Sequence, residues 1–269
     1  MSEGDTITRT ARNLQTALAG RHLTRLDLTR RGGAKPPPGT EIVAVEARGK
    51  HLLVHFADGR SLHTHLQMHG SWHLYRSGEP WRRSRAQARV VLEVDDGTVA
   101  VCFAAPTVEL LDPGRVRPAA AGLDSLGPDL CRAGVRIDEI LRRLARLDPS
   151  VEVGPALLDQ RVAAGIGNVY KSEVCFACRV EPGTPIGALD AATRRALYER
   201  AALLLQANVA RTRRVTVTGG LAVYGRAGEA CRRCGTRIRR RRQGTPTRST
   251  YWCPECQPTG AARRDTAPD

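Results

Sequence analysis

Four cysteines near the C-terminus constrain the fold of this chain more than any other feature. Cys231 and Cys234 form one CxxC pair, Cys253 and Cys256 form a second, and 18 residues separate the pairs. Two such pairs supply four thiolates at the spacing of a tetrahedral zinc site. The polar segment 225–256 has too few apolar residues for its own core, so we expect one structural zinc ion to stabilise it. Four unrelated thiols are the alternative.

Positive charge is concentrated in the same part of the sequence. The 269 residues have a net charge of +15, and residues 211–250 hold twelve arginines and one acid, Glu229, which together account for +11. Such a concentrated patch indicates a polyanion-binding surface, with nucleic acid as the expected partner. Arginine usage imposed by a GC-rich genome is the alternative, but it would not gather the charge into one segment.

Composition excludes several other classes of protein. With 41% hydrophobic residues the chain is too apolar for a disordered basic tail. It has no run of ~18 apolar residues that could span a membrane. The segment Met1–Asp5 is acidic and lacks the apolar region of a signal peptide. We therefore expect a bacterial cytoplasmic protein, nucleoid-associated when bound to DNA, whose eight cysteines are thiols or metal ligands rather than disulfides.

Hydrophobic periodicity divides the chain into a β-rich part and a helical part. Apolar residues recur at helical spacing within 6–19, which predicts a leading helix. Short alternating runs and Asp-Gly turns then predict an antiparallel β domain of six to eight strands, followed by helices from about residue 113. The expected strands are 42–47, 52–57, 61–66, 71–75, 89–95 and 98–103, and the expected helices are 135–147, 155–163, 169–178 and 190–209. Residues 76–88 are expected to be a basic loop and 122–128 a linker.

A Gly-x-Gly turn lies between two of the expected helices. Gly165 and Gly167 precede Asn168 at the start of the helix predicted for 169–178. Backbone N–H groups at a helix N-terminus bind phosphate, and the Asn168 side chain adds a donor. Gly-x-Gly turns are common in proteins. The interpretation of this one as a contact to the DNA backbone therefore depends on the arginine-rich segment that follows it.

Two further clusters favour structural interpretations. Cys175 and Cys178 lie in an expected helix with apolar neighbours, so buried thiols are favoured over a second metal site. His63, His65 and His69 share strand parity, which makes a metal site conceivable. With few carboxylates nearby, a polar groove lined by histidines is favoured.

Five separated motifs, in one order, resemble the formamidopyrimidine-DNA glycosylase and endonuclease VIII family, on the endonuclease VIII side. They are Met1–Asp5, Arg48–Leu52, His65–Gly70, Leu158–Tyr170 and Cys231–Cys256 with its Arg248–Pro254 stretch. The resemblance spans residues 2–257. It implies an α+β fold: an N-terminal antiparallel β-sandwich with a leading helix (1–115), a helix–two-turn–helix DNA-binding domain (122–222), a zinc-finger β-hairpin (223–257) and a disordered tail (258–269), with DNA between the domains.

The resemblance assigns catalysis to Ser2, Glu3, Lys50 and Arg248. The family begins Met-Pro-Glu and attacks the damaged nucleotide with the proline imine, whereas this chain has Ser2. Removal of Met1 would leave a primary amine with a pKa near ~8. A helix N-terminus lowers that pKa, and a primary amine forms a Schiff base as lysine does.

The resemblance also assigns a role to each of the other three catalytic residues. Glu3 resembles the acid/base that opens the sugar ring, with a plain first-turn helix acid as the alternative. Lys50, one of only three lysines, resembles the strand lysine that assists base loss and elimination. Arg248 resembles the zinc-finger arginine that binds the phosphate next to the lesion.

DNA binding is assigned to two groups of residues. Gln67, Met68 and His69 resemble the wedge that fills the duplex when the damaged base leaves the stack, with a core methionine as the alternative for Met68. The residues expected to hold the DNA backbone are Gly165, Gly167, Asn168, Lys171 and Arg248.

These features predict a bifunctional enzyme of base-excision repair. It would remove oxidised bases, with pyrimidines the expected class, and cleave the abasic strand by β- or β,δ-elimination through a Schiff base. It would act as a monomer on double-stranded DNA with damaged bases or abasic sites. The alternative is a zinc-dependent, lyase-impaired or non-catalytic binder of damaged DNA, because of Ser2. A sequence-specific transcription factor is disfavoured, since no recognition helix with dimer symmetry is visible.

Overall fold

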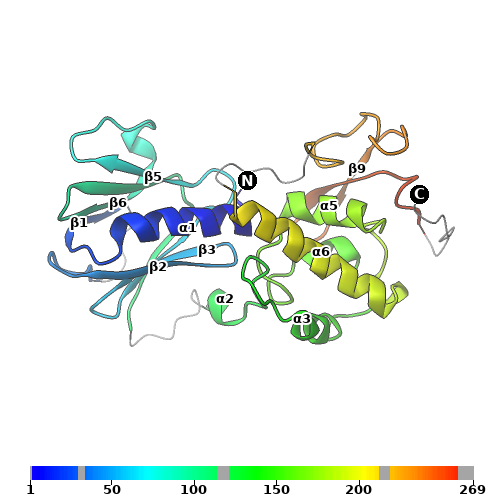
Figure 1. Cartoon of the computed structure of the whole chain (residues 1–269), viewed down its shortest axis with the longest axis horizontal. Helices are drawn as coiled ribbons and strands as arrows, with labels where there is room; N and C mark the ends of the chain where they lie inside the picture. The colour runs from blue at the N-terminus through cyan, green and yellow to red at the C-terminus, as the bar shows by residue number, and fades with distance from the viewer. Residues whose placement is uncertain (1, 30–33, 114–120, 212–218, 260–269) are drawn as a thin grey trace. The chain divides into compact units, whose positions relative to one another are not determined.

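A computed structural model describes residues 2–29, 34–113, 121–211 and 219–259 (Figure 1). The chain divides into two compact units, Met1–Leu126 and Gly127–Asp269. We call them unit 1 and unit 2. All but the first two residues of the expected disordered tail lie outside the described residues. Within the described ranges, no helix is both long and apolar enough to cross a membrane.

Unit 1 consists of a leading helix, α1 (Gly4–Leu18), and two four-stranded antiparallel sheets. One sheet has the order β2-β3-β4-β8 and the other the order β1-β6-β7-β5. The predicted antiparallel β-sandwich with a leading helix is confirmed. Its strands are β1 (Leu23–Leu28), β2 (Ile42–Arg48), β3 (His51–Phe56), β4 (Ser61–His65), β5 (Ser71–Arg76), β6 (Ala88–Val94), β7 (Thr98–Phe103) and β8 (Thr107–Leu111), with a 3-10 turn η1 (Arg85–Gln87) in the expected basic loop.

The core of unit 1 follows from the strand and helix periods. In β3, Leu52 and Val54 are fully buried, whereas His51 and His55 belong to the opposite face of the sheet. The apolar face of α1 packs against β2 and β3 of one sheet and β7 of the other. Gln15 fixes the helix, because its Oε1 accepts a hydrogen bond from the backbone of β2. The helix α1 is therefore held in a defined place on the sandwich.

Unit 2 contains a helical core and a two-stranded hairpin. Three of the four predicted helices are found near their expected bounds, while the one predicted at 155–163 ends at Leu158. The Asp159 carboxylate accepts a hydrogen bond from the Arg161 backbone, a local turn that competes with helix. The elements are α3 (Ile137–Leu144), α4 (Val153–Leu158), α5 (Asn168–Ala177), η2 (Ile186–Ala188), α6 (Ala191–Val209), β9 (Arg239–Gln243) and β10 (Arg248–Trp252). The short helix α2 (Ala121–Asp124) overlaps the linker expected at 122–128 and belongs to unit 1.

The hairpin region shares its small core with the helices. Val223, Ile238 and two of the cysteines are buried together with Phe176, which belongs to α5. The guanidinium of Arg233 lies 4.3 Å from the centroid of the Phe176 ring. The polar segment thus has no independent core, as its composition predicts.

Candidate active site and cysteine cluster

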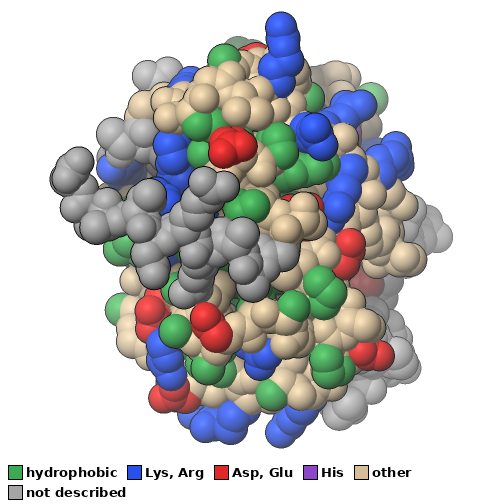
Figure 2. Space-filling model, turned by 90° about the vertical axis from the view of Figure 1, so that its right-hand side faces the viewer, with side chains coloured by type: hydrophobic (Ala, Val, Ile, Leu, Met, Phe, Trp, Pro, Cys, Tyr) green, Lys and Arg blue, Asp and Glu red, His purple; other side chains and the backbone are tan. Residues whose placement is uncertain are grey.

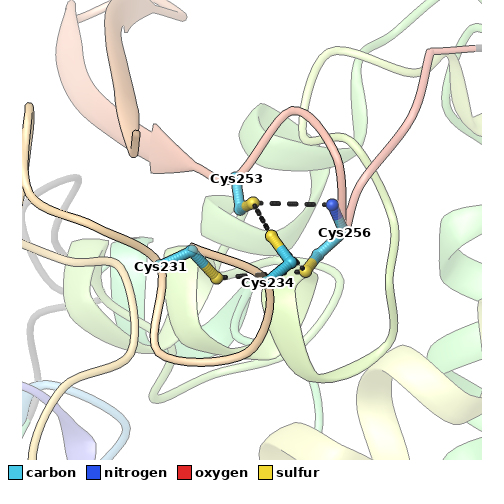
Figure 3. Close-up of side chains that lie close together, drawn as sticks. All are labelled: Cys231, Cys234, Cys253 and Cys256. Atoms are coloured by element: carbon cyan, nitrogen blue, oxygen red, sulfur yellow. Dashed lines mark hydrogen bonds between the residues drawn. The ribbon is translucent and has the colours of Figure 1, made fainter. Parts of the chain in front are cut away.

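The four cysteines of the hairpin region converge on one point (Figure 3). The Sγ atoms of Cys234 and Cys253 are 3.4 Å apart, those of Cys234 and Cys256 3.5 Å, and those of Cys231 and Cys256 3.9 Å. Four thiolates at ~2.3 Å from a tetrahedral ion would be separated by about 3.8 Å. The cluster therefore has the size and the donor set for a single metal ion.

Other candidate metal ligands do not form such a group. Among the described residues, the hairpin cysteines alone bring three or more Cys, His, Asp or Glu ligands together. Cys175 is fully buried in α5, and burial raises the pKa of the half-buried Cys178 to about 11. The favoured interpretation of these two residues as helix thiols is consistent with this placement.

Gln257 holds the second cysteine pair, a role that the sequence did not suggest. Its side chain is fully buried. The amide oxygen accepts a hydrogen bond from the Cys253 backbone at 2.9 Å, and the amide nitrogen donates to the Val180 carbonyl at 2.8 Å. The loop of the cluster is thus tied to the chain that follows α5.

Ser2 and Glu3 lie where α1 begins. Ser2 precedes the helix and Glu3 occupies its N-cap position. The Ser2 backbone nitrogen donates a hydrogen bond to the carbonyl of Gln67 at 3.2 Å. Glu3 is fully buried, a rare condition for a carboxylate. A removed Met1 would therefore leave an amine beside a buried acid at a helix N-terminus.

Gln67, Met68 and His69 form a tight turn between β4 and β5. Gln67 has φ 47°, a left-handed conformation. A Cβ on Gly70 would lie 2.6 Å from the Leu66 carbonyl oxygen, so the turn requires glycine there. Met68 is 47% exposed, which removes the alternative of a core methionine. The turn presents an apolar side chain to solvent at a rigid position.

Arg83, from the loop between β5 and β6, braces this turn. Its Nη1 donates to the His69 carbonyl at 3.2 Å and to the Ser71 hydroxyl at 2.9 Å. The guanidinium also lies 5.7 Å from the centre of the Phe103 ring. The sequence indicated only a basic loop, and no spacing could connect Arg83 with the turn.

Lys50 occupies the turn between β2 and β3 rather than a strand. It is half-buried. Its positive charge contributes to the lowered pKa of both His51 and His65, after burial of the two rings.

The Gly-x-Gly turn of unit 2 has the geometry expected for it. Gly165 has φ +110°, and Gly167 is the N-cap residue of α5. Gln160 closes the turn, because its Oε1 accepts from the Gly165 backbone and its Nε2 donates to the Ile166 carbonyl. The turn leads directly into the helix N-terminus that begins at Asn168.

Asn168 and Lys171 both reach the strand β10. Asn168 Nδ2 donates to the Ser249 carbonyl at 2.7 Å. Lys171 is 1% exposed, and its Nζ donates to the Thr250 hydroxyl at 2.6 Å. These bonds fix the strand whose first residue is the exposed Arg248. Asn168 and Lys171 thus tie the start of α5 to the strand that carries Arg248.

A buried polar chain continues from β10 to the helices. Thr250 donates to the Gln243 amide oxygen at 2.8 Å, and Gln243 Nε2 donates to Glu152 at 2.7 Å. On the other side of the hairpin, the Glu173 carboxylate accepts three backbone N–H groups, those of Ala222, Val223 and Tyr224. The hairpin is therefore anchored to the helices at two points.

The arginine run of β9 is divided between two roles. Arg239, Arg240 and Arg242 are exposed. Arg241 is half-buried and its Nη2 lies 3.2 Å from the buried Glu181 carboxylate. Figure 2 shows Lys and Arg side chains at the upper right of the face in view and also along its left and lower edges. Three arginines of the run are thus available to a polyanion.

The fold and these features define a class. It is a multidomain protein suited to bind a polyanion such as nucleic acid, with a helix-led β-sandwich, a Gly-x-Gly turn at a helix N-terminus, a four-cysteine hairpin and exposed arginines.

Comparison with known proteins gives the family. Residues 1–106 match the formamidopyrimidine-DNA glycosylase N-terminal domain, and residues 126–218 match the H2TH domain of the same family. The chain is 44% identical over 270 residues to the probable endonuclease 8 2 of Streptomyces coelicolor, covering 98% of this chain and 96% of that one. It is 41% identical over 266 residues to the DNA-(apurinic or apyrimidinic site) lyase Nei2 of Mycolicibacterium smegmatis, covering 96% and 99%.

Solved structures agree on the fold. Formamidopyrimidine-DNA glycosylase of Lactococcus lactis, bound to DNA with an abasic site, has a TM-score of 0.80 at 23% identity, covering 95% of this chain and 99% of that one. The chain belongs to the formamidopyrimidine-DNA glycosylase and endonuclease VIII family. It is a bifunctional DNA glycosylase and DNA-(apurinic or apyrimidinic site) lyase of base-excision repair, with the predicted α+β fold and helix–two-turn–helix domain.

Proposed function

We propose that this enzyme removes oxidised pyrimidines and then cleaves the abasic strand through a Schiff base on the Ser2 amine. The observation that carries the proposal is the placement of Ser2 at the start of α1, directly before the fully buried Glu3. The choice of pyrimidines rests on the resemblance to the endonuclease VIII side of the family, and the Escherichia coli relative named endonuclease 8 is 30% identical over 269 residues.

The residues of unit 1 have separate roles in this proposal. The Ser2 amine attacks the sugar carbon C1′, and the helix N-terminus favours its uncharged, nucleophilic form. Glu3 delivers a proton that opens the sugar ring. Lys50 is a cationic proton donor that assists base loss and elimination. Gln67, Met68 and His69 fill the space that the flipped nucleotide leaves.

The residues of unit 2 hold the DNA backbone. The N–H groups of the turn Gly165–Gly167 and the start of α5 bind phosphate. Arg248 binds the phosphate next to the lesion through its planar fork, which also favours δ-elimination. Asn168 and Lys171 support both sites, since their side chains bond to β10. The exposed arginines of β9 add affinity that does not depend on sequence.

Zinc is the proposed ion of the cysteine cluster. Cys231, Cys234, Cys253 and Cys256 would hold it, and four thiolates leave no position for a reacting water. The ion would stabilise the hairpin and take no part in the reaction. The proposed partner is double-stranded DNA with damaged bases or abasic sites, the enzyme acting as a monomer. Because that DNA is in the nucleoid, we propose a cytoplasmic location.

The alternative function is a zinc-dependent binder of damaged DNA without lyase activity. The observation that favours it is Ser2, since the family uses proline at this position. Borohydride trapping on abasic-site DNA distinguishes the two. Mature protein should form a covalent adduct whose modified peptide begins at Ser2. A matched variant with one extra residue before Ser2 should bind the same DNA without an adduct. Binding by both proteins with no adduct from either would establish the alternative.

A further inference from the structure

The basic loop between β5 and β6, residues 77–87, carries positive charge that the proposed function does not use. It contains three arginines and one acid, Glu79. Glu79 lies at the start of the loop, where its carboxylate accepts a hydrogen bond from the Arg76 backbone. Arg82 and Arg85 are exposed, and among the residues that the structure describes neither forms an ion pair with a carboxylate. Unit 1 thus has a concentrated positive surface of its own, in addition to the arginines of β9 in unit 2.

The strand register brings the end of this loop back to the turn 67–69. Ser71, the first residue of β5, and Ala88, the first residue of β6, both pair with Phe103 of β7. The strands β5 and β6 therefore begin at the same end of the sheet. The loop leaves β5 at the opposite end and has to run back along the sheet to reach β6. Its last residues consequently lie at the end of the sheet where the turn is.

Direct contacts agree with the register. Arg83 of the loop donates to the His69 carbonyl at 3.2 Å, and its Nε donates to the Gln87 side chain at 3.1 Å. Arg89, which follows the loop, lines the same cavity as His69. The turn proposed to enter the duplex and the end of the basic loop are therefore neighbours within unit 1.

Aromatic side chains hold the loop in place. The rings of Trp81 and Phe103 meet edge to face, with centroids 5.8 Å apart. The guanidinium of Arg85 lies 4.8 Å from the Trp81 centroid, a cation–π contact, and the Arg82 backbone donates to the Tyr75 hydroxyl at 3.1 Å. Because these groups are already ordered, binding a ligand would cost them little conformational entropy.

We propose that Arg82 and Arg85 bind backbone phosphates of the undamaged DNA strand, opposite the lesion. The inference rests on the proposed function, in which the turn 67–69 enters the duplex where the damaged base leaves. Duplex DNA carries one negative charge per about 1.7 Å of its axis, so a protein surface beside that turn faces phosphates. Arg248 of unit 2 is assigned to the damaged strand, which leaves the undamaged strand for unit 1. A surface for an acidic protein would have no need to adjoin the turn.

The first experiment compares duplex and single-stranded DNA that carry the same stable abasic analogue. The double variant Arg82→Ala, Arg85→Ala should bind the duplex about tenfold more weakly at about 0.1 M salt. The slope of log K against log salt concentration should become shallower by about 1.8, because each phosphate contact contributes about 0.9. Affinity for the single strand should not change, since it contains only the damaged strand.

The matched control is the double variant Arg21→Ala, Arg76→Ala, which removes the same charge from the same unit. Both arginines are exposed and contact Asp96, and Arg76 pairs with Thr98 at the end of the sheet away from the turn. This variant should bind both DNAs as the wild type does, because charges beyond about 10 Å are screened at 0.1 M salt.

Three results of this comparison would overturn the proposal. The two double variants could lose the same affinity, which would make the effect one of net charge. The Arg82 and Arg85 variant could lose as much affinity for the single strand as for the duplex, which would assign the loop to the damaged strand. It could also bind the duplex as well as the wild type, which would leave the loop to an acidic protein partner.

Ethylation of individual phosphates identifies the strand directly. In the wild type, ethylation of phosphates opposite the lesion on the undamaged strand should weaken binding, and in the Arg82 and Arg85 variant the same modifications should have no effect. Interference confined to the damaged strand would also contradict the proposal. The abasic analogue is not cleaved, so these results do not depend on the Schiff base. A wild-type protein that gives no borohydride adduct would disprove the proposed lyase, while the strand contacts are still measured.

Discussion

The backbone nitrogen of Ser2 donates a hydrogen bond to the carbonyl oxygen of Gln67 at 3.2 Å. The nitrogen proposed to attack the sugar and the turn proposed to replace the flipped base are therefore in direct contact. The carbonyl belongs to a residue with φ 47° in a turn closed by Gly70, so its direction is fixed. Arg83 braces the same turn from the other side. In the proposed mechanism, base displacement and nucleophile placement would therefore depend on one short segment.

The buried carboxylate beside Ser2 should be essential to the chemistry. Glu3→Gln keeps the shape of the side chain but cannot deliver a proton. We expect base excision and abasic-strand cleavage to fall by about 10²- to 10⁴-fold, the range of general acid–base catalysis. Single-turnover gel assays measure the rate, and the affinity for DNA containing a stable abasic analogue should be unchanged. A rate equal to that of the wild type would leave Glu3 as a plain acid at the start of α1 with no part in the chemistry.

Met68 should matter more for damaged bases than for abasic sites. Met68→Ala removes the side chain proposed to fill the stack, so excision of an oxidised base should slow by about tenfold. Cleavage of a pre-formed abasic site should change less, since no base has to leave the stack. Val43→Ala is the matched control, because Val43 is also 47% exposed in the same unit. Equal effects of Met68→Ala on both substrates would contradict the wedge.

Arg248 and Arg240 should separate two kinds of phosphate contact. Arg240→Ala should weaken binding to all DNA alike. It should also make the slope of log K against log salt concentration shallower by about the contribution of one phosphate contact. Arg248→Ala should also slow strand cleavage at the lesion. Both residues are exposed on the same hairpin, which makes them a matched pair. Identical losses in binding and cleavage for the two variants would mean that Arg248 has no special role at the lesion.

The sequence predicted which helices, strands and cysteine cluster each part of the chain contains, but not the contacts between these elements. Alternating runs predict the strands, and the cysteine spacing predicts the cluster, because both depend on short-range periodicity. The bonds of Lys171 with Thr250 and of Gln257 with Val180 join residues more than seventy positions apart, and no local pattern encodes them. The helix predicted at 155–163 ended early because Asp159 bonds the backbone two residues on. The histidines were expected to line a polar groove, and the bonds of His63 with His51 and Glu109 depend on the pairing of three strands.

Lys171 should link the stability of unit 2 to its activity. Lys171→Met keeps the length of the side chain but removes the donor of the buried Thr250 hydroxyl, while the Ser249 carbonyl keeps its bond from Asn168. A buried polar group that loses its partner costs about 1–3 kcal/mol, so the urea midpoint should fall. Because β10 begins at Arg248, cleavage should fall too. Lys35→Met, at an exposed lysine of unit 1, is the control. Unchanged stability would mean that the bond to β10 contributes nothing.

Removal of the metal should affect the hairpin before the rest of the molecule. The hairpin shares only a small core with Phe176, so the thiolate cluster supplies much of its stability. A chelator should release one zinc ion per chain, measured with a chromogenic indicator. It should also abolish binding to abasic-site DNA while the β-sandwich keeps its far-ultraviolet circular dichroism. Cys253→Ala should reproduce this, whereas Cys102→Ala, at a buried thiol of β7, should retain zinc and DNA binding. Full DNA binding by zinc-free protein would show that the buried bonds of Glu173 and Lys171 hold the hairpin without the ion.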